Sequence, residues 1–243
     1  MCKKIRVKPV VFIFSTILTF AALLTVVLTL NASAYSSSIE VLNSLEYDKT
    51  VIIDPGHGGP DGGAVGVDGA VEKGINLAIA LKLRNFFVTS GYRVIMTRED
   101  DHTICNKNCH TLRSMKSSDL HNRLKIVNAH TKALFISIHQ NIYDNPIYSG
   151  AQVFYSQNNK DSRELAELLQ LDISDMLQPQ NDREIKPAED NLYILYNAKS
   201  PAVMVECGFL SNPEECKMLQ DDDYQNKMAF AIFYGVLHFY SQH

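Results

Sequence analysis

From residue 50 onward, short apolar runs rich in β-branched residues alternate with longer amphipathic stretches. The first run covers residues 50–53 and stops at Asp54-Pro55-Gly56, a pattern typical of a buried strand followed by a sharp turn. The first amphipathic stretch covers residues 72–90, where apolar residues recur at helical spacing until Gly91. A chain that alternates strands and helices in this way is expected to bury one sheet between helices.

Further elements follow the same pattern. We predict strands at residues 92–97, 133–138, 151–155, 193–196 and 202–205, and helices at 118–127, 161–177, from residue 213, and at 224–239. No internal repeat and no second domain boundary is evident. The sequence therefore predicts one α/β domain, a single sheet of about six strands with helices on both faces.

A different kind of segment precedes this domain. Residues 10–30 form a run of 21 residues without a charge, about 31 Å long as a helix, which is enough to cross a bilayer. Four basic residues before the run favour the cytoplasmic side, so the remainder would be exported. The small residues at 32–34 suit signal peptidase, although the run is longer than a usual cleaved signal. We predict a signal or anchor segment at 1–34 and a linker at 35–48, followed by the α/β domain at 49–243.

Charge excludes one class of partner. Residues 1–39 contain four basic side chains and no acid, so the rest of the chain carries 19 basic and 27 acidic side chains, a net charge of −8. Such a body would repel the phosphates of nucleic acid. We therefore expect no nucleic-acid partner.

Three predicted strands each end in a side chain that can bind a metal or move a proton. His57 follows the first strand, His139 ends the 133–138 run, and Glu206 ends the last one. Sites in open α/β sheets form beyond the carboxyl ends of the strands. Glu72 opens the first helix after a loop containing seven glycines between Gly56 and Gly69. Two imidazoles, one carboxylate and an open position describe a catalytic zinc site, with a spare carboxylate as proton carrier. Taken singly, each residue could equally be structural.

Several blocks of the sequence occur in a fixed order: residues 54–59 (DPGHGG), 72–73, 96–98, 137–141 (SIHQN) and 201–212 (PAVMVECGFLSN). Together they resemble the zinc-dependent N-acetylmuramoyl-L-alanine amidases of bacterial cell-wall metabolism. The extended block at 54–66, with residues 149–152 and the amino-terminal segment, looks most like the sporulation branch. The resemblance covers nearly all of residues 50–240.

The resemblance implies specific roles. The family's ligands for one zinc ion per chain fall on His57, Glu72 and His139, and its catalytic glutamate falls on Glu206. The fold would be a twisted mixed sheet, and the substrate would be peptidoglycan glycan strands with stem peptides. Cleavage between the lactyl group of N-acetylmuramic acid and L-alanine would lead to muramic-δ-lactam in the spore cortex, and hence to germination.

The resemblance also implies a location and leaves alternatives open. The enzyme would be extracytoplasmic, in the wall or cortex of a spore-forming bacterium, anchored to the membrane through residues 10–30, with or without an activating protein partner. Arg98, Arg123 and Asn141 could orient the site or bind substrate. The rival hypotheses are another zinc peptidoglycan hydrolase, namely a deacetylase or carboxypeptidase, and a non-catalytic wall-binding module.

One stretch departs from the family pattern. His102, Cys105, Cys109 and His110 lie close together in the sequence. Cys105 and Cys109 could form a disulfide in an extracytoplasmic compartment, the four side chains could hold a second zinc ion, or the thiols could be free. The sequence leaves these three alternatives open.

Overall fold

The structure, a computed structural model, describes residues 49–243 together with Leu18, Phe20 and residues 22–29. The described amino-terminal residues are helical. Within the described part of the chain, no helix is both long enough and apolar enough to cross a membrane. Much of the predicted membrane segment at 10–30 and all of the predicted linker at 35–48 lie outside the described residues.

A six-stranded mixed sheet forms the centre of residues 49–243, as predicted. Its strands are β1 (Thr50–Pro55), β2 (Arg93–Met96), β3 (Leu134–Asn141), β4 (Gln152–Tyr155), β5 (Lys186–Pro187) and β6 (Ala202–Phe209). They lie in the order β2-β1-β3-β6-β4-β5, and every pair is parallel except β4 with β6. The central strands β1, β3 and β6 therefore bring their carboxyl ends to the same edge.

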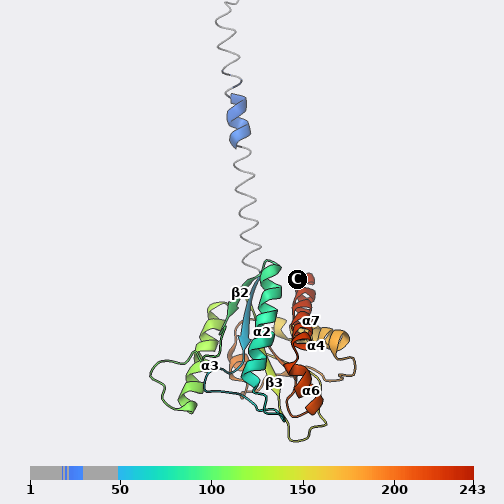
Figure 1. Cartoon of the computed structure of the whole chain (residues 1–243). Coiled ribbons are helices and arrows are strands. Elements are labelled where there is room, and N and C mark those ends of the chain that lie inside the picture. Colours follow the sequence, from blue (N-terminus) through green and yellow to red (C-terminus); the bar gives the residue numbers. More distant parts are fainter. Residues whose placement is uncertain (1–17, 19, 21, 30–48) are drawn as a thin grey trace, which may run out of the picture. The chain divides into compact units, whose positions relative to one another are not determined.

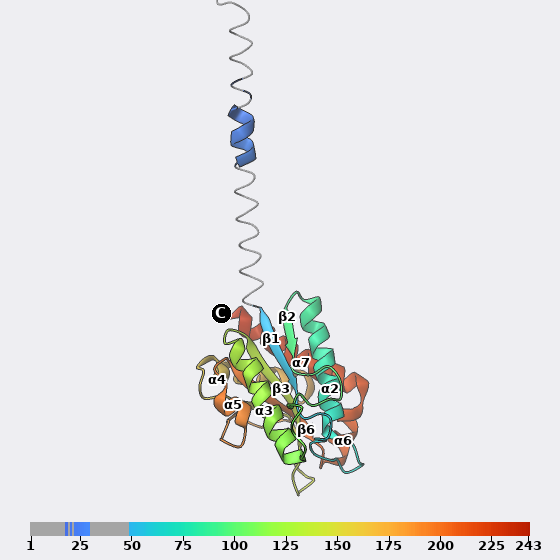
Figure 2. The same ribbon diagram turned by 90° about the vertical axis from the view of Figure 1, so that its left-hand side faces the viewer.

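Helices cover both faces of the sheet, which confirms the predicted architecture. They are α2 (Glu72–Thr89), α3 (Leu112–Ala129), α4 (Asp161–Leu177), α5 (Tyr193–Asn197), α6 (Pro213–Gln220) and α7 (Asp222–Ser241). Helices α2, α4 and α7 pack against one face, where α7 contacts both of the others (Figure 1). Helices α3 and α5 cover the opposite face, which is turned toward the viewer in Figure 2.

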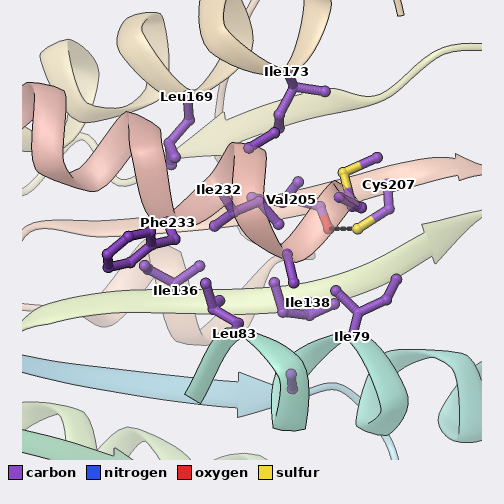
Figure 3. Packing of buried hydrophobic residues seen from close by; sticks show 14 of the residues in the cluster. Ile79, Leu83, Ile136, Ile138, Leu169, Ile173, Val205, Cys207, Ile232 and Phe233 are labelled. Atoms are coloured by element: carbon purple, nitrogen blue, oxygen red, sulfur yellow. Dashed lines mark hydrogen bonds between the residues drawn. The ribbon is translucent and has the colours of Figure 1, made fainter. Parts of the chain in front are cut away.

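The two faces divide the core according to the alternation of side chains along each strand. On the first face, Ile136, Ile138 and Val205 meet apolar side chains of α2, α4 and α7 (Figure 3). On the second face, Phe135 of β3 and Met204 of β6 pack with side chains of α3 and α5. Continuing this alternation places His139 and Glu206 on the second face.

Two local predictions were wrong. Residues 193–196, predicted as a strand, form the short helix α5, and the sixth strand is the two-residue β5. Both Ile194 and Leu195 are buried, which one turn of helix at the sheet allows and a strand with one solvated face would not. Helix α3 begins at Leu112 rather than near residue 118, because Thr111 and Ser114 form a reciprocal capping box.

Candidate active site

The sheet register brings together the ends of three strands. Pro55 of β1 pairs with Ile138 of β3, and His139 of β3 pairs with Glu206 of β6. Paired residues in neighbouring strands direct their side chains to the same face. His57 follows β1 by two residues, and its ring lies edge-on to that of His139, with 4.9 Å between the ring centroids.

Two buried arginines fix the turn that carries His57. Arg98 donates from Nε to the carbonyl of Pro55 (3.0 Å) and from Nη2 to that of Gly56 (2.9 Å). Arg123 donates from Nη1 to the carbonyl of Pro55 (2.9 Å) and from Nη2 to that of His57 (2.7 Å). These contacts hold His57 at a φ of 63°, a left-handed conformation that is uncommon outside glycine. Both arginines act on the backbone of the turn.

A buried carboxylate compensates the charge of Arg123. Asp54 accepts hydrogen bonds from Arg123 (2.5 Å), Thr97 (2.6 Å) and Ser137 (2.7 Å), and Arg123 also contacts Asp119. Burial alone would raise the pKa of Asp54, but Arg123 and the two hydroxyl donors hold the pKa below its ordinary value. The turn bearing His57 thus rests on an internal ionic cluster.

Glu72, the first residue of α2, lies between the two histidines. Its Oε2 is 3.2 Å from Nε2 of His57, and its Oε1 is 3.0 Å from Nδ1 of His139. Backbone N–H groups of Ala64 (2.8 Å) and Gln140 (3.1 Å) also donate to this carboxylate. Burial would raise the pKa of Glu72, but hydrogen bonds from His139 and His57 hold it well below its usual range. Glu72 is therefore an ionised, tightly positioned carboxylate.

The second nitrogen of His57 also has a carboxylate partner. Nδ1 of His57 is 2.9 Å from Oδ2 of Asp61, whose Oδ1 is 2.7 Å from Nζ of Lys116. Because a carboxylate can only accept, Nδ1 carries a hydrogen directed at Asp61, and Nε2 carries one directed at Glu72. Burial would lower the pKa of His57, but Asp61 and Glu72 raise it to about 9.

The approach of these side chains requires glycine at two positions. A Cβ at Gly63 would lie 2.4 Å from Oε2 of Glu72, and a Cβ at Gly56 would lie 2.2 Å from Nε2 of His139. Any larger residue would displace a side chain of the site. Close packing around Glu72 and His139 thus explains two of the seven glycines, Gly56 and Gly63.

His57, Glu72 and His139 form a group that can hold a metal ion. One donor atom from each lies within 4.8 Å of the others, and this is the only such group found among the described residues. Two imidazoles with one carboxylate match the donor set that zinc prefers. A cavity of about 90 Å³ beside the group is lined by both histidines, Asp61 and Lys116, with Ile194 of α5.

Glu206 completes the arrangement. Its Oε2 is buried and has no hydrogen-bond partner, although the residue as a whole is partly exposed. Burial raises the pKa of Glu206 to about 7. The charge of Glu72 adds to this increase, whereas the charges of His139 and His57 oppose it. Such an unpartnered carboxylate next to a donor set is what a general acid–base group requires, because it can both accept and donate a proton near neutral pH.

All four predicted site residues are thus brought together, and Asn141 lines a neighbouring cavity. Sequence reasoning missed Asp61 and Lys116. Asp61 has a recognisable signal, since it lies four residues after His57 in the glycine-rich loop. Lys116 has none, because it comes from α3 and its proximity depends on the tertiary fold.

The cysteine stretch lies between β2 and α3 and is separate from this group. Cys105 and Cys109 are free and partly buried, and His102 contacts Asp100. None of the four side chains belongs to a metal-binding group found among the described residues.

Fold and site together define an α/β protein with a His–Glu–His group and a carboxylate at the carboxyl edge of its sheet. Residues 51–238 match the N-acetylmuramoyl-L-alanine amidase family, and the chain belongs to that family. It is therefore an N-acetylmuramoyl-L-alanine amidase, as the sequence predicted.

Individual relatives agree with this assignment. The germination-specific N-acetylmuramoyl-L-alanine amidase of Bacillus subtilis is 36% identical over 194 residues, covering 80% of this chain and 81% of the relative. The CwlD amidase of Clostridioides difficile, solved in complex with the GerS lipoprotein, is 43% identical with a TM-score of 0.77, covering 80% of this chain and all of that one. A second amidase, from Clostridium difficile 630, has 31% identity and a TM-score of 0.68, covering 79% of this chain and 96% of that one.

Proposed function

We propose that this amidase is zinc-dependent, with His57, Glu72 and His139 as metal ligands and Glu206 as the catalytic residue. The observation that carries the proposal is the position of Glu72, whose two oxygens face nitrogens of different histidines at 3.2 and 3.0 Å. Three such donors leave one position of a tetrahedral ion open for the reaction. Zinc in such a site supplies a Lewis acid and lowers the pKa of a water molecule to about 7.

The chain's own residues would then carry out the proton transfers. Glu206 accepts a proton from the attacking water and later donates it to the L-alanine amine, which leaves poorly without it. A pKa of about 7 in the buried environment suits both roles near neutral pH. Asp61 holds the Nδ1–H of His57 and so leaves Nε2 for the ligand position, as a carboxylate behind a metal-bound histidine generally does.

The names of the relatives support a cellular location and a substrate for this reaction. One is named a germination-specific amidase, and another was solved with a lipoprotein partner. We propose that the chain acts outside the cytoplasm on spore-cortex peptidoglycan, in the reaction sequence that yields muramic-δ-lactam. Residues 1–34 would export and anchor it, residues 35–48 would link it to the catalytic domain at 49–243, and a protein partner could activate it. The exposed Leu18, Phe20 and Leu23 of the described amino-terminal helix suit an apolar surrounding.

Product analysis tests the proposed reaction. Purified protein is incubated with cortex peptidoglycan, and the released fragments are identified by mass spectrometry. We expect peptides that begin with a free L-alanine amine, their loss on chelation, and their return when zinc is added back. Free acetate or a free terminal amino acid as the product would contradict the proposal, as would full activity of a metal-free sample.

A further inference from the structure

Beyond Glu206, the same edge of the sheet contains a second cavity, of about 250 Å³. Asn141, Tyr143 and Tyr148 line one part of it, and Gln152, Arg183 and Phe209 line another, together with Phe154 and Lys186. The surface is aromatic and basic. The body of the chain is strongly acidic, so two cations directed at one cavity are a local exception.

Arg183 is held firmly at this cavity. Its guanidinium lies 4.5 Å from the ring centroid of the buried Phe209 and 5.9 Å from that of Tyr148. Its Nε donates to the carbonyl of Ser149 (2.8 Å). Stacking on aromatic rings fixes the plane of a guanidinium, and the N–H groups of Arg183 other than those donated to Ser149 and Gln152 remain available to bind a ligand.

No acidic side chain of the described residues forms an ion pair with this guanidinium. Among the described residues, neither Arg183 nor Lys186 forms an ion pair within 4.0 Å. The charge of Arg183 does act on Glu215. However, the two oxygens of Glu215 accept the backbone N–H groups of Gly150 and Phe209, each at 2.8 Å. The cavity is therefore prepared for an anion from outside the chain.

The cavity begins one strand away from Glu206. Gln152 of β4 pairs in register with Glu206 of β6, so their side chains share a face. Nη1 of Arg183 lies 3.5 Å from Oε1 of Gln152. Paired Cα atoms are about 5 Å apart, and Arg183 lies beside Gln152. A group bound by Arg183 would therefore lie only a few residues along the substrate's peptide from the bond that is cleaved at Glu206.

We propose that Arg183, assisted by Lys186, binds a free carboxylate of the stem peptide and so positions the peptide for cleavage. This inference rests on the proposed function. The peptide attached at the scissile amide is acidic, since its second residue, D-glutamate, has a carboxyl group outside the peptide linkage. A planar guanidinium binds a carboxylate through two parallel hydrogen bonds, a match that neither tyrosine nor asparagine provides.

The test compares two substrates and four proteins. The substrates are synthetic muramoyl peptides that differ only in whether this second-residue carboxyl group is free or amidated. The proteins are the wild type, Arg183→Gln, Arg183→Lys and the control Arg84→Gln, which removes an arginine of α2 that is ion-paired with Glu99. We expect Arg183→Gln to raise KM for the acid about 10-fold or more, as loss of a charge-assisted hydrogen bond would, and to leave the amide unaffected. Arg183→Lys should retain part of the preference, and Arg84→Gln all of it.

Binding measurements separate this inference from the proposed reaction. In Glu206→Gln protein, calorimetry should show tighter binding of the acid than of the amide, and the added Arg183→Gln change should abolish that difference. If the wild type releases no L-alanine peptide, the proposed function is wrong. The calorimetric comparison of acid and amide still tests the carboxylate site in that case. Equal effects of Arg183→Gln on both substrates, or no effect on either, would refute the carboxylate site, the first result pointing to contact with the glycan.

Discussion

The two halves of the site are built in different ways. His139 and Glu206, which we call the strand half, lie in neighbouring strands of the sheet centre, where the backbone ladder alone sets their separation. His57 and Glu72, which we call the loop half, come from a turn and a helix start that are joined by a glycine-rich loop. Their positions depend on side-chain contacts, chiefly those of Arg98, Arg123 and Asp61, and on the backbone N–H groups that bind Glu72.

Because of this difference, substitutions in the two halves should impair the site in different ways. A substitution in the strand half can remove a chemical group while the sheet keeps its geometry. A substitution behind the loop half removes the support of a ligand without touching the ligand itself. Activity, metal affinity and stability should therefore respond in different proportions to changes in the two halves.

The largest expected effect is on turnover, from the strand half. Glu206→Gln keeps the size of the side chain but cannot accept the proton, so kcat should fall by about 10²- to 10⁴-fold. Zinc content and melting temperature should stay close to those of the wild type, because the sheet positions the residue. The control is Glu167→Gln, an exposed carboxylate on α4 that should leave kcat unchanged. Near-normal hydrolysis by Glu206→Gln would remove this residue from the mechanism.

The second effect is on stability, from the loop half. Arg123→Met leaves the buried Asp54 without its cation, removes one of the two arginine donors to the carbonyl of Pro55, and removes the arginine donor to the carbonyl of His57. Breaking a buried ion pair in this way costs about 3–5 kcal/mol of unfolding free energy, which urea titration would measure. Zinc affinity should fall with it, since the turn of His57 loses its support.

The matched control for Arg123→Met is Arg84→Met, which removes an exposed arginine paired with Glu99. An exposed pair contributes at most about 1 kcal/mol. Similar losses in the two variants would mean that the internal ionic cluster does not support the turn.

The third effect concerns zinc itself. A ligand bound only by the folded state at 100 times its Kd stabilises that state by about 2.7 kcal/mol. Because the loop half depends on long-range contacts and seven glycines, most of the added order should appear there. Hydrogen exchange with and without zinc should show slower exchange at residues 56–72 and little change in β3 and β6. Equal protection in both halves would show that the loop is already ordered without the metal.

The same contrast explains how far the sequence could be interpreted. The strand half was predictable, because β-branched runs ending in His139 and Glu206 fix both the element and its edge of the sheet. Glu72 became a candidate through its place at a helix start after the glycine-rich loop together with the family resemblance, because a carboxylate at a helix start is by itself usually structural. The contact between Asp61 and His57 could not be predicted, because it depends on the backbone conformation of His57, whose φ is positive. Residues 193–196 were misassigned because local β propensity was overridden by packing against the sheet. The roles of the four site residues and the location of the membrane segment stay predictions.

The smallest expected effect comes from the support behind His57. Asp61→Asn keeps the shape of the side chain but removes the charge that orients the imidazole through Nδ1–H. Loss of such a partner typically weakens metal binding by about 10- to 100-fold. Competition with a chromogenic chelator should therefore show a fall in zinc affinity within this range, while the fold is unchanged.

Lys116→Gln is the matched control, since it leaves Asp61 and His57 in place and removes only the partly exposed cation that contacts Asp61. An ion pair of that exposure contributes less than about 1 kcal/mol, so zinc affinity should change less than about fivefold. If Asp61→Asn and Lys116→Gln weakened zinc binding equally, the loop half would be held by the net charge of this region, and the specific contact between Asp61 and His57 would lose its assigned role.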